Sequence, residues 1–253
     1  MSIIGQAETI DIVPAERLIA FSAAILTDAG ADEPTARDAT RAMFHASLHG
    51  IDSHGFRLLP HYRAAIQGGR LNGTPDMIFT QTRPGAGTLD ADHAHGARAM
   101  YEAASRAADL AREAGIAAVG IRNSSHYGAA GAYALELAKQ GLGALVFGNS
   151  NSLVRLHDGA TRFHGTNPIA AGFPADGNPW LIDMATSSIP WNRVHLYRSL
   201  GESLPDGIAS NTSGRDVTDP NEADMLAPLG GAFGFKGAGL GGVAEIFSAV
   251  MTG

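Results

Sequence analysis

The chain has 253 residues, of which 45% are hydrophobic and 17% charged, so it is long enough to bury a large core and too apolar for a disordered tail. Its net charge of −7 and the lack of any cluster of Lys or Arg argue against nucleic acid as a partner. The chain has no cysteine, which excludes disulfides, thiolate nucleophiles and Cys-ligated metals.

Neither end of the sequence predicts a membrane segment or an export signal. The first residues lack a basic region and carry Glu8 and Asp11, unlike a signal peptide. The longest apolar run, Gly237–Gly253, is interrupted by Glu245 and is too short to cross a bilayer. We therefore expect a cytoplasmic protein with no membrane partner.

The first 75 residues predict helices. Apolar residues recur at helical spacing between proline and glycine signals, which gives three helices: one from Pro14 up to Gly30, one from Asp32 to Gly50, and one over Leu58–Gln67. The residues between the second and third helices form a polar, glycine-flanked turn. We expect residues 1–75 to be a helical region of their own.

From residue 76 to 253 the pattern alternates between strands and helices, which predicts an α/β domain. Strands are expected at Asp76–Thr82, Thr88–Ala91, Ile116–Ile121, Leu142–Phe147, Pro168–Phe173 and Trp180–Met184, with the third and fourth buried. Helices are expected at His95–Gly115, Gly128–Gln140 and Leu240–Met251. The segment Ser199–Pro228, rich in Gly, Pro, Asp and Asn, is expected to wrap over the surface.

The polar turn Gly50–Gly55 holds the first candidates for chemistry, Ser53 and His54. An imidazole titrates near neutral pH, and a neighbouring serine or aspartate can orient it as an acid or a base. The alternative is an ordinary turn histidine on the surface, since the chain has ten histidines.

A second candidate is the turn Asn123–Gly128 (NSSHYG), which contains His126. It follows a predicted strand and leads into a predicted helix, where free backbone N–H groups would suit an anionic ligand. A loop in which Ser124 or Ser125 simply caps the helix would explain the serines but not the histidine. Three further polar turns flank predicted strands, as ligand sites in α/β proteins do: Gly148–Ser152, Gly165–Pro168 and Asp183–Ser188.

Lys236 is one of only two lysines and lies in an apolar, glycine-rich segment. A cation there is costly unless it meets an anion, so we expect a phosphate or carboxylate partner; the alternative is a solvated loop lysine. The adjacent Gly237–Gly242 satisfies G-x-G-x-x-G, but no strand precedes it, so we expect its glycines to allow close helix packing. No residues stand at metal-ligand spacing, and no metal is predicted.

Taken together in this order, the turns resemble the malate/L-lactate dehydrogenase family. The matching segments span the chain from residue 14 onward: Gly50–Tyr62 (GIDSHGFRLLPHY), Asn123–Gly128 (NSSHYG), Gly165–Pro168 (GTNP), Asp183–Ser187 (DMATS) and Leu226–Gly239 (LAPLGGAFGFKGAG). The resemblance implies an α/β fold without a classical Rossmann domain: an N-terminal helical region and a mixed, largely antiparallel central sheet with helices. It also implies a homodimeric dehydrogenase that uses NAD or NADP to interconvert a small 2-hydroxy acid and a 2-oxo acid.

The resemblance also implies roles for individual residues. It makes His54 the acid/base with Ser53 as its partner, His126 a second proton-transfer group, and Asp183 a proton donor in some members. Thr166 is implied to contact the substrate. The implied cofactor-binding residues are His126, Tyr127, Gly128, Ala129, Ala130, Ser150, Met184, Ala185, Thr186 and Lys236. Which histidine is the acid/base stays open.

The chain departs from the family pattern in three places. Arg57 is our expected clamp for the substrate carboxylate, because a guanidinium can bind it through two hydrogen bonds, but the family places its arginine at the next position, here Leu58. Ile189–Arg193 replaces a family segment with small residues, which predicts a different pocket wall. Family chains also continue beyond the equivalent of Gly253, so we expect a chain shortened at its C-terminus.

Two other functions compete with the dehydrogenase. A truncated, catalytically inactive relative would act as a binding or assembly subunit, folding without turning over substrate. A Ser-His hydrolase would use Ser53 or Ser125 as its nucleophile. Adjacent serine and histidine rarely face each other as nucleophile and base, and no G-x-S-x-G elbow is present, which argues against the hydrolase.

Overall fold

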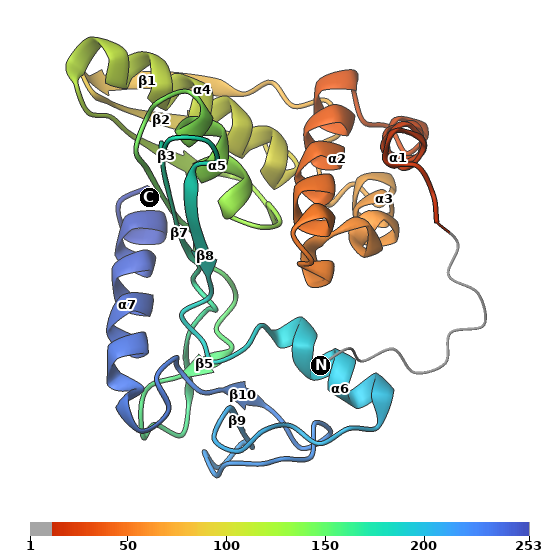
Figure 1. Cartoon of the computed structure of the whole chain (residues 1–253), viewed down its shortest axis with the longest axis vertical. Helices are drawn as coiled ribbons and strands as arrows, with labels where there is room; N and C mark the ends of the chain where they lie inside the picture. Colours follow the sequence, from red (N-terminus) through yellow and green to blue (C-terminus); the bar gives the residue numbers. More distant parts are fainter. Residues whose placement is uncertain (1–11, 253) are drawn as a thin grey trace.

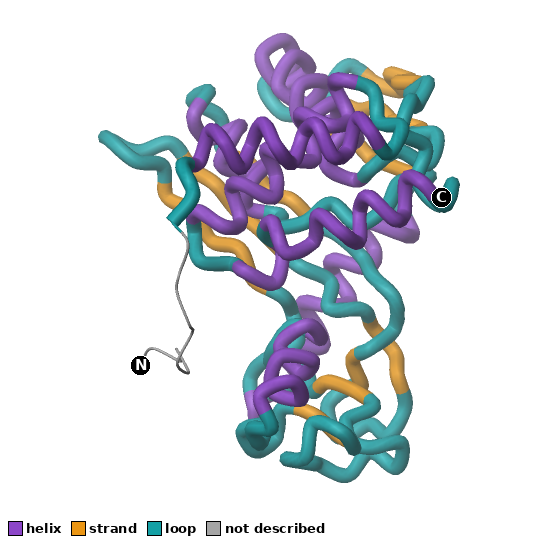
Figure 2. The backbone as a smooth tube through the Cα atoms, turned by 90° about the vertical axis from the view of Figure 1, so that its right-hand side faces the viewer, coloured by secondary structure: helices purple, strands orange, loops and turns teal. Residues whose placement is uncertain are grey.

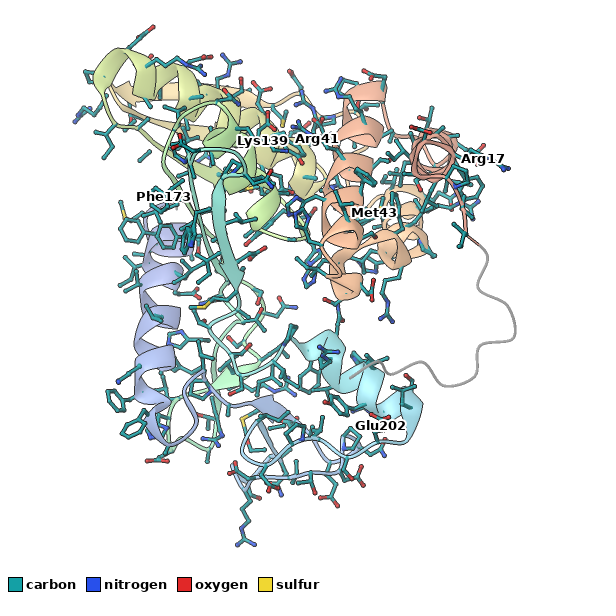
Figure 3. The ribbon with its side chains drawn as sticks, viewed as in Figure 1. Arg17, Arg41, Met43, Lys139, Phe173 and Glu202 are labelled. Atoms are coloured by element: carbon teal, nitrogen blue, oxygen red, sulfur yellow. The ribbon has the colours of Figure 1, made fainter. Side chains whose placement is uncertain are left out.

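Three helices at the start of the chain form a cluster of their own, red to orange in Figure 1. The computed structural model describes residues 12–252, so the signal-peptide expectation falls mainly outside the described residues. The helices are α1 (Ala15–Asp28), α2 (Glu33–Leu48) and α3 (Leu59–Gln67), as predicted. They enclose a core built around Leu26, Met43 and Tyr62, and Figure 3 shows Met43 directed into this cluster while Arg17 points outward from α1.

A three-stranded sheet follows, covered on one face by a long helix. It contains β1 (Ile78–Arg83), β2 (Ala86–Asp90) and β3 (Ala118–Arg122), with β1 antiparallel and β3 parallel to β2. Helix α4 (Gly96–Ala114) packs its alanine-rich side on Leu89. The expectation of a buried strand at Ile116–Ile121 was wrong, because β3 is an edge strand with one face open, and Ile116 is 80% exposed.

The second sheet is antiparallel and lies at the centre of the molecule. Its strands are β4 (Ala144–Phe147), β7 (Ile169–Phe173) and β8 (Trp180–Met184), and α5 (Gly131–Lys139) covers one face. The strand β4 alternates instead of being buried throughout as expected: Val146 faces α5, whereas Leu145 is 61% exposed on the other face. The helix also begins three residues later than expected, because Gly128 adopts a left-handed φ of 81° that ends any helix there.

The lower part of the molecule is a small four-stranded sheet with its own core. It is formed by β5 (Val154–Arg155), β6 (Arg162–His164), β9 (Ala209–Ser210) and β10 (Met225–Leu226), in the order β6-β5-β10-β9, next to α6 (Trp191–Leu200). The expectation that Ser199–Pro228 only wraps over the surface was therefore wrong. Leu204, Ala209 and Leu226 are buried with Val194, and the segment supplies four of the six buried residues of this core.

The chain ends in α7 (Phe235–Glu245), which continues into a wider π-type turn over Ile246–Val250 and runs along the side of the molecule (Figures 1 and 2). Gly237 and Gly241 lie against Leu229 and Thr186, so the glycines allow close packing, as predicted. One apolar side of this helix lies partly open: Val243 and Phe247 are 42% and 49% exposed. Within residues 12–252, no helix is both long and apolar enough to cross a bilayer.

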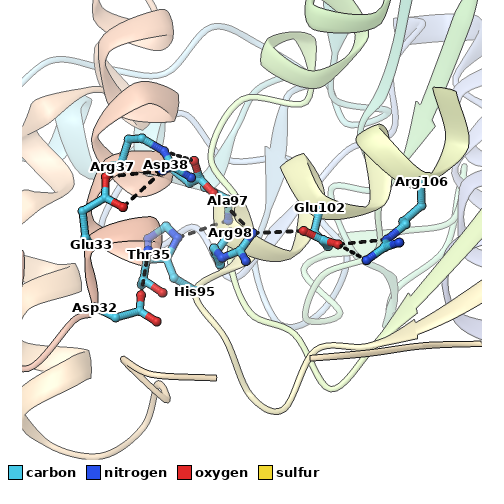
Figure 4. Close-up of polar contacts among 10 residues, drawn as sticks. All are labelled: Asp32, Glu33, Thr35, Arg37, Asp38, His95, Ala97, Arg98, Glu102 and Arg106. Atoms are coloured by element: carbon cyan, nitrogen blue, oxygen red, sulfur yellow. Dashed lines mark hydrogen bonds and ion pairs between the residues drawn. The ribbon is translucent and has the colours of Figure 1, made fainter. Parts of the chain in front are cut away.

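A polar network fastens α2 to α4, and hence the helical cluster to the α/β part (Figure 4). Asp38 is buried and accepts a 3.1 Å hydrogen bond from Nε of Arg37, while Arg98 lies 3.6 Å away. Burial raises the pKa of Asp38 although the arginines oppose the shift. At the start of α4, Nδ1 of His95 accepts the backbone N–H of Ala97. The fold is thus a mixed, largely antiparallel α/β arrangement without a doubly wound parallel sheet among the described strands, as predicted.

Candidate functional site

Two histidines that are far apart in the sequence meet at one place. His54 lies in a 3₁₀ turn (Asp52–His54) after α2, and Oγ of Ser53 hydrogen-bonds Nδ1 of His54 at 2.8 Å. The imidazole of His126 stacks on that of His54, with ring centroids 5.5 Å apart and planes at 22°. The expected Ser-His pair and the second expected histidine therefore form a single imidazole cluster.

Tyr62 completes this cluster, and sequence reasoning did not single it out. Its Oη lies 2.7 Å from Nδ1 of His126, and the side chain is 2% exposed. Tyr62 stands on the inner face of α3, eight residues after His54, and its ring packs on the edge of His95 at 4.2 Å. A buried tyrosine on a core-facing helix position looks like ordinary core in the sequence, and only its long-range contact distinguishes it.

The surroundings of His54 and His126 lower the pKa of both imidazoles and so favour their neutral forms near pH 7. Burial lowers the pKa of His54. Loss of hydration lowers the pKa of His126 too, and the charges of His54, His61 and Arg70 lower it further, although His126 as a whole residue is exposed. Burial raises the pKa of Tyr62 above its ordinary value, so its hydroxyl stays protonated. Each imidazole has a hydroxyl partner at Nδ1, and its Nε2 makes no hydrogen bond to any residue that the structure describes.

The three further turns expected at strand ends also come together. Oγ of Ser150 accepts the backbone N–H of Thr166 at 3.0 Å and lies 3.2 Å from Oγ1 of the same residue. The backbone N–H of Thr186 donates to the carbonyl of Thr166 at 2.9 Å. Ser150 is exposed and Thr166 half-buried, whereas Thr186 is buried and uses its hydroxyl within the turn. Two accessible hydroxyls thus stand side by side.

Two contacts join these hydroxyls to the imidazole cluster. The ring of Tyr127, next to His126, lies against the backbone of Gly148, so closely that a Cβ there would stand 2.7 Å from Cζ of Tyr127. The hydroxyl of Tyr127 is buried and has no hydrogen-bond partner among the described residues. Asp183 accepts the backbone N–H of Gly131 at 2.7 Å. The turns containing Ser53, His126, Ser150, Thr166 and Asp183 are therefore neighbours in space.

Asp183 binds a backbone N–H group that was predicted to be available to an anionic ligand. The free N–H groups expected beside His126 lie at the true helix start, Gly131, and Asp183 already accepts one of them. Burial raises the pKa of Asp183, and the hydrogen bond from Gly131 opposes that shift. Among the described residues Asp183 makes no hydrogen bond to His54 or His126, so its visible contact is with α5. Ala129 and Ala130 are buried before this helix, and Met184 and Ala185 are half-buried after the aspartate.

Arg57 does not join the imidazole cluster. Its exposed side chain lines a cavity with Leu18 of α1 and Phe44 of α2, and within residues 12–252 it makes no hydrogen bond to either histidine. Arg70, which follows α3, donates to Nε2 of His61 at 2.9 Å, and its charge is among those that lower the pKa of His126. The cation whose field reaches the cluster is thus Arg70, which sequence reasoning missed.

Lys236 is exposed in the first turn of α7, which corrects the premise that it is held in an apolar turn and needs an anion. Its Nζ lies 5.4 Å and 6.0 Å from the ring centroids of Phe233 and Phe235, and within residues 12–252 it forms no ion pair. Its link to the turns is indirect: Leu229, on which Gly237 packs, donates its N–H to the carbonyl of Thr186. No three His, Asp or Glu side chains of the described part gather as a metal site would require.

Lowering the pH from 7 to 5 is expected to reduce the free energy of unfolding by about 2 kcal/mol through His95 alone. His95 is 1% exposed, and burial lowers its pKa from 6.5 to about 3. At pH 5 the unfolded chain therefore binds a proton that the folded chain does not, and stability falls as the pH drops below 6.5. Urea unfolding at both pH values measures the change.

The matched control is His95→Asn, which keeps a side-chain acceptor for the N–H of Ala97 but cannot titrate. It should remove that part of the pH dependence. An equally steep loss of stability in the variant would contradict this assignment.

Comparison with known proteins places the chain among dehydrogenases. A model of the malate/L-lactate dehydrogenase family matches residues 13–253. The malate dehydrogenase of Pyrococcus abyssi is 38% identical over 248 residues, which cover 95% of this chain and 68% of that relative. The (2R)-3-sulfolactate dehydrogenase (NADP(+)) of Chromohalobacter salexigens is 35% identical over 240 residues, covering 92% of this chain and 70% of the relative.

Solved structures agree with the sequence comparison. The crystal structure of malate dehydrogenase from Entamoeba histolytica superimposes with a TM-score of 0.91 at 28% identity, over 96% of this chain and 71% of that one. The matched region includes every turn described above. On the family match and on the identity to these relatives, the chain belongs to the malate/L-lactate dehydrogenase family.

Proposed function

We propose that this chain is an NAD(P)-dependent dehydrogenase that interconverts a small 2-hydroxy acid and its 2-oxo acid, with histidine as the acid/base. The observation that carries the proposal is the imidazole cluster: the rings of His54 and His126 stack with their centroids 5.5 Å apart, and each has a hydroxyl partner at Nδ1. Relatives named for malate and for sulfolactate support a substrate with a carboxylate beside the reacting carbon.

The residues around the cluster fit a nicotinamide nucleotide. The exposed hydroxyl of Ser150, the half-buried hydroxyl of Thr166 and the hydroxyl of Tyr127, which has no partner among the described residues, are the hydrogen-bonding groups that a ribose or a carboxamide requires. We assign the nucleotide to His126–Ala130, Ser150, Met184–Thr186 and Lys236, with Lys236 near a phosphate. When bound, the nucleotide accepts or delivers a hydride at the carbon that carries the hydroxyl group.

One of the two imidazoles exchanges the hydroxyl proton. In its base form, Nδ1–H donates to the hydroxyl oxygen of Ser53 or Tyr62, and the lone pair of Nε2 is free for the substrate proton. When Nε2 takes up the proton, Nδ1–H still donates to the same hydroxyl oxygen, so this partner serves the histidine before and after proton transfer. Because the rings are in contact, a charge on His54 disfavours one on His126, and only one of them carries the proton at a time.

The division of labour follows the two regions predicted from the sequence. We propose that residues 1–75 supply Ser53 and His54, and that residues 76–253 hold the nucleotide and contribute His126. Thr166 is proposed to contact the substrate, since it is half-buried beside Ser150. Asp183 is proposed to act on proton transfer only through α5, whose first N–H it binds.

We propose Arg70, whose charge acts on His126, as a partner of the substrate carboxylate, so replacing it by Gln is expected to raise the KM for the acid about tenfold. Arg57 is the alternative clamp suggested by the sequence, so Arg57→Gln is the matched variant. Steady-state kinetics at saturating nucleotide separates them. We expect Arg57→Gln to change the KM less than Arg70→Gln, since Arg57 lies toward α1 and α2. A larger rise in KM for Arg57→Gln than for Arg70→Gln would instead identify Arg57 as the partner of the substrate carboxylate.

The direct test of the proposed function is titration with NADH and NADPH, followed by fluorescence, and then assay against a panel of 2-hydroxy acids. We expect saturable binding of at least one nucleotide and turnover of at least one acid. If neither nucleotide binds, the oxidoreductase proposal fails.

A second candidate function is favoured by the open apolar side of α7 and its π-type turn. Val243, Phe247, Val250 and Met251 are between 42% and 71% exposed, and apolar patches of this kind mark contacts between proteins. We propose a homodimer on this observation, and sedimentation velocity tests it. The same feature suits an inactive relative that serves as a binding or assembly subunit. That candidate predicts assembly without turnover in the assay above.

A further inference from the structure

Asn167 is a fully buried polar side chain whose amide is satisfied on both sides, and no role has so far been given to it. Its Oδ1 accepts the backbone N–H of Ser150 at 3.2 Å. Its Nδ2 donates to the carbonyl of Gly241 at 3.1 Å and to Oε2 of Glu245 at 2.7 Å. One side chain thus ties the turn after β4 to helix α7.

The backbone of Asn167 ties in a third segment. Oγ1 of Thr186 donates to the carbonyls of Thr166 and Asn167, at 3.2 Å each. Gly165 lies so close that an added Cβ would stand 2.5 Å from both Oδ1 of Asn167 and Oγ of Ser150. The turns that carry Ser150, Thr166 and Thr186 therefore have no independent freedom, because all three are bound to residue 167 or to its immediate neighbours.

Only asparagine meets the requirements of this position. An acceptor must face Ser150 while donors face Gly241 and Glu245, and the neutral amide is the short side chain that supplies both. The backbone of residue 167 has a φ of 33°, a left-handed conformation in which asparagine is enriched among residues other than glycine. Aspartate would lose both donors and bring a second carboxylate to within hydrogen-bond distance of Glu245.

We propose that Asn167, together with Glu245, is a positioning residue that sets the affinity for the nicotinamide nucleotide. It does so by fixing the turns that carry Ser150 and Thr166 to α7, the helix whose first turn contains Lys236. This inference rests on the proposed nucleotide-binding function. Asn167 is buried and, among the described residues, its side chain makes no hydrogen bond to His54 or His126, so it acts on these histidines at most indirectly.

The test compares Asn167→Asp with a matched variant elsewhere. Nδ2 of Asn72 donates to Oδ2 of Asp92 at 2.8 Å, so Asn72→Asp creates the same carboxylate pair outside the turn cluster. The dissociation constants for NADH and NADPH are measured by fluorescence under conditions in which urea unfolding shows each variant to be folded. We expect Asn167→Asp to raise the dissociation constant at least tenfold, and Asn72→Asp to leave it within twofold of wild type.

A second variant and a second readout keep the inference testable if Asn167→Asp does not fold. Glu245→Ala removes one acceptor and leaves the bond from Asn167 to Gly241, and we expect it to raise the dissociation constant about threefold. Amide hydrogen exchange is also measured on the nucleotide-free variants. The N–H of Ser150 binds Oδ1 of Asn167, so it should exchange faster in the variants of Asn167 and Glu245 than in wild type. These readouts do not depend on turnover.

These measurements distinguish a failure of the proposed function from a failure of the positioning role of Asn167. Wild-type protein that binds neither nucleotide overturns both the proposed function and this inference. Wild-type binding that is unchanged in the folded variants of Asn167 and Glu245 leaves the function intact and overturns the positioning role. Equal weakening by Asn72→Asp would also overturn it, because the effect would then follow from general destabilisation.

Discussion

Turnover is expected to fall about 10²–10⁴-fold when the proton-transferring histidine, either His54 or His126, is replaced by alanine. Both imidazoles have a hydroxyl at Nδ1, and the Nε2 of each has no hydrogen-bond partner within residues 12–252, so either geometry suits a base. The variant of the histidine that touches the substrate oxygen should lose kcat with little change in nucleotide affinity. The other variant should show the smaller loss that follows from removing a ring in contact with the base.

Two controls make this prediction specific. His195→Ala removes an exposed histidine on α6 and should leave kcat within twofold of wild type. Tyr62→Phe removes the partner at Nδ1 of His126 without emptying the core, and should lower kcat about tenfold if His126 is the base. Steady-state kinetics with each variant ranks the two histidines. If His54→Ala and His126→Ala both changed kcat only slightly, neither histidine would be the acid/base of the reaction.

Gly96→Ala is expected to cost about 1–3 kcal/mol of stability and about 10²-fold in turnover. Gly96 is the first residue of α4, and a Cβ there would lie 2.7 Å from both the carbonyl carbon and the oxygen of His126. Backbone atoms cannot rotate away as a flexible side chain can. Moreover, the N–H of Gly96 donates to Oγ of Ser125, so the strain falls directly on the turn that carries His126.

The control for this prediction is Gly239→Ala in α7, where an added Cβ meets nothing within 4 Å. Alanine favours a helix over glycine by about 1 kcal/mol, so this variant should be as stable as wild type or slightly more so, with unchanged kcat. Urea unfolding and steady-state kinetics are measured on both variants. Wild-type stability and turnover in Gly96→Ala would show that α4 does not hold the His126 turn in place.

The helices could be predicted from the sequence because their signals are local. Asp32 caps α2 through its bond to the N–H of Thr35, and the helix-ending glycines stand where expected. Burial could not be read in the same way. A short apolar run such as that of β3 does not reveal whether the strand lies inside a sheet or at its edge. The segment Ser199–Pro228 has a loop-like composition, yet its Leu204, Met225 and Leu226 are buried. Leu204 and Leu226 belong to a core with residues distant in sequence, such as Val154.

The candidate site could be predicted as a set of turns but not as a set of contacts. The meeting of the His54 and His126 turns was expected from the family resemblance, and the rings are in contact. Sequence reasoning missed Tyr62 because it stands on the core-facing side of a helix, and it missed Arg70 because nothing local links the turn after α3 to the histidines. It placed Lys236 in an apolar environment because neighbouring aromatic residues suggest burial, although Phe233 and Phe235 are 61% and 56% exposed.

Transfer of the hydride from the 2-hydroxy acid to the nicotinamide can be followed directly with deuterium. The protein is incubated with NAD⁺ or NADP⁺ and with malate or another 2-hydroxy acid that carries deuterium on the hydroxyl-bearing carbon, and the reduced nucleotide is analysed by mass spectrometry. If the imidazole cluster and the neighbouring turns form one dehydrogenase site, the deuterium is recovered on the nicotinamide ring, and it is strongly diminished in the His54→Ala or the His126→Ala variant. A nucleotide that binds but gains no deuterium from any acid in the panel would contradict the account.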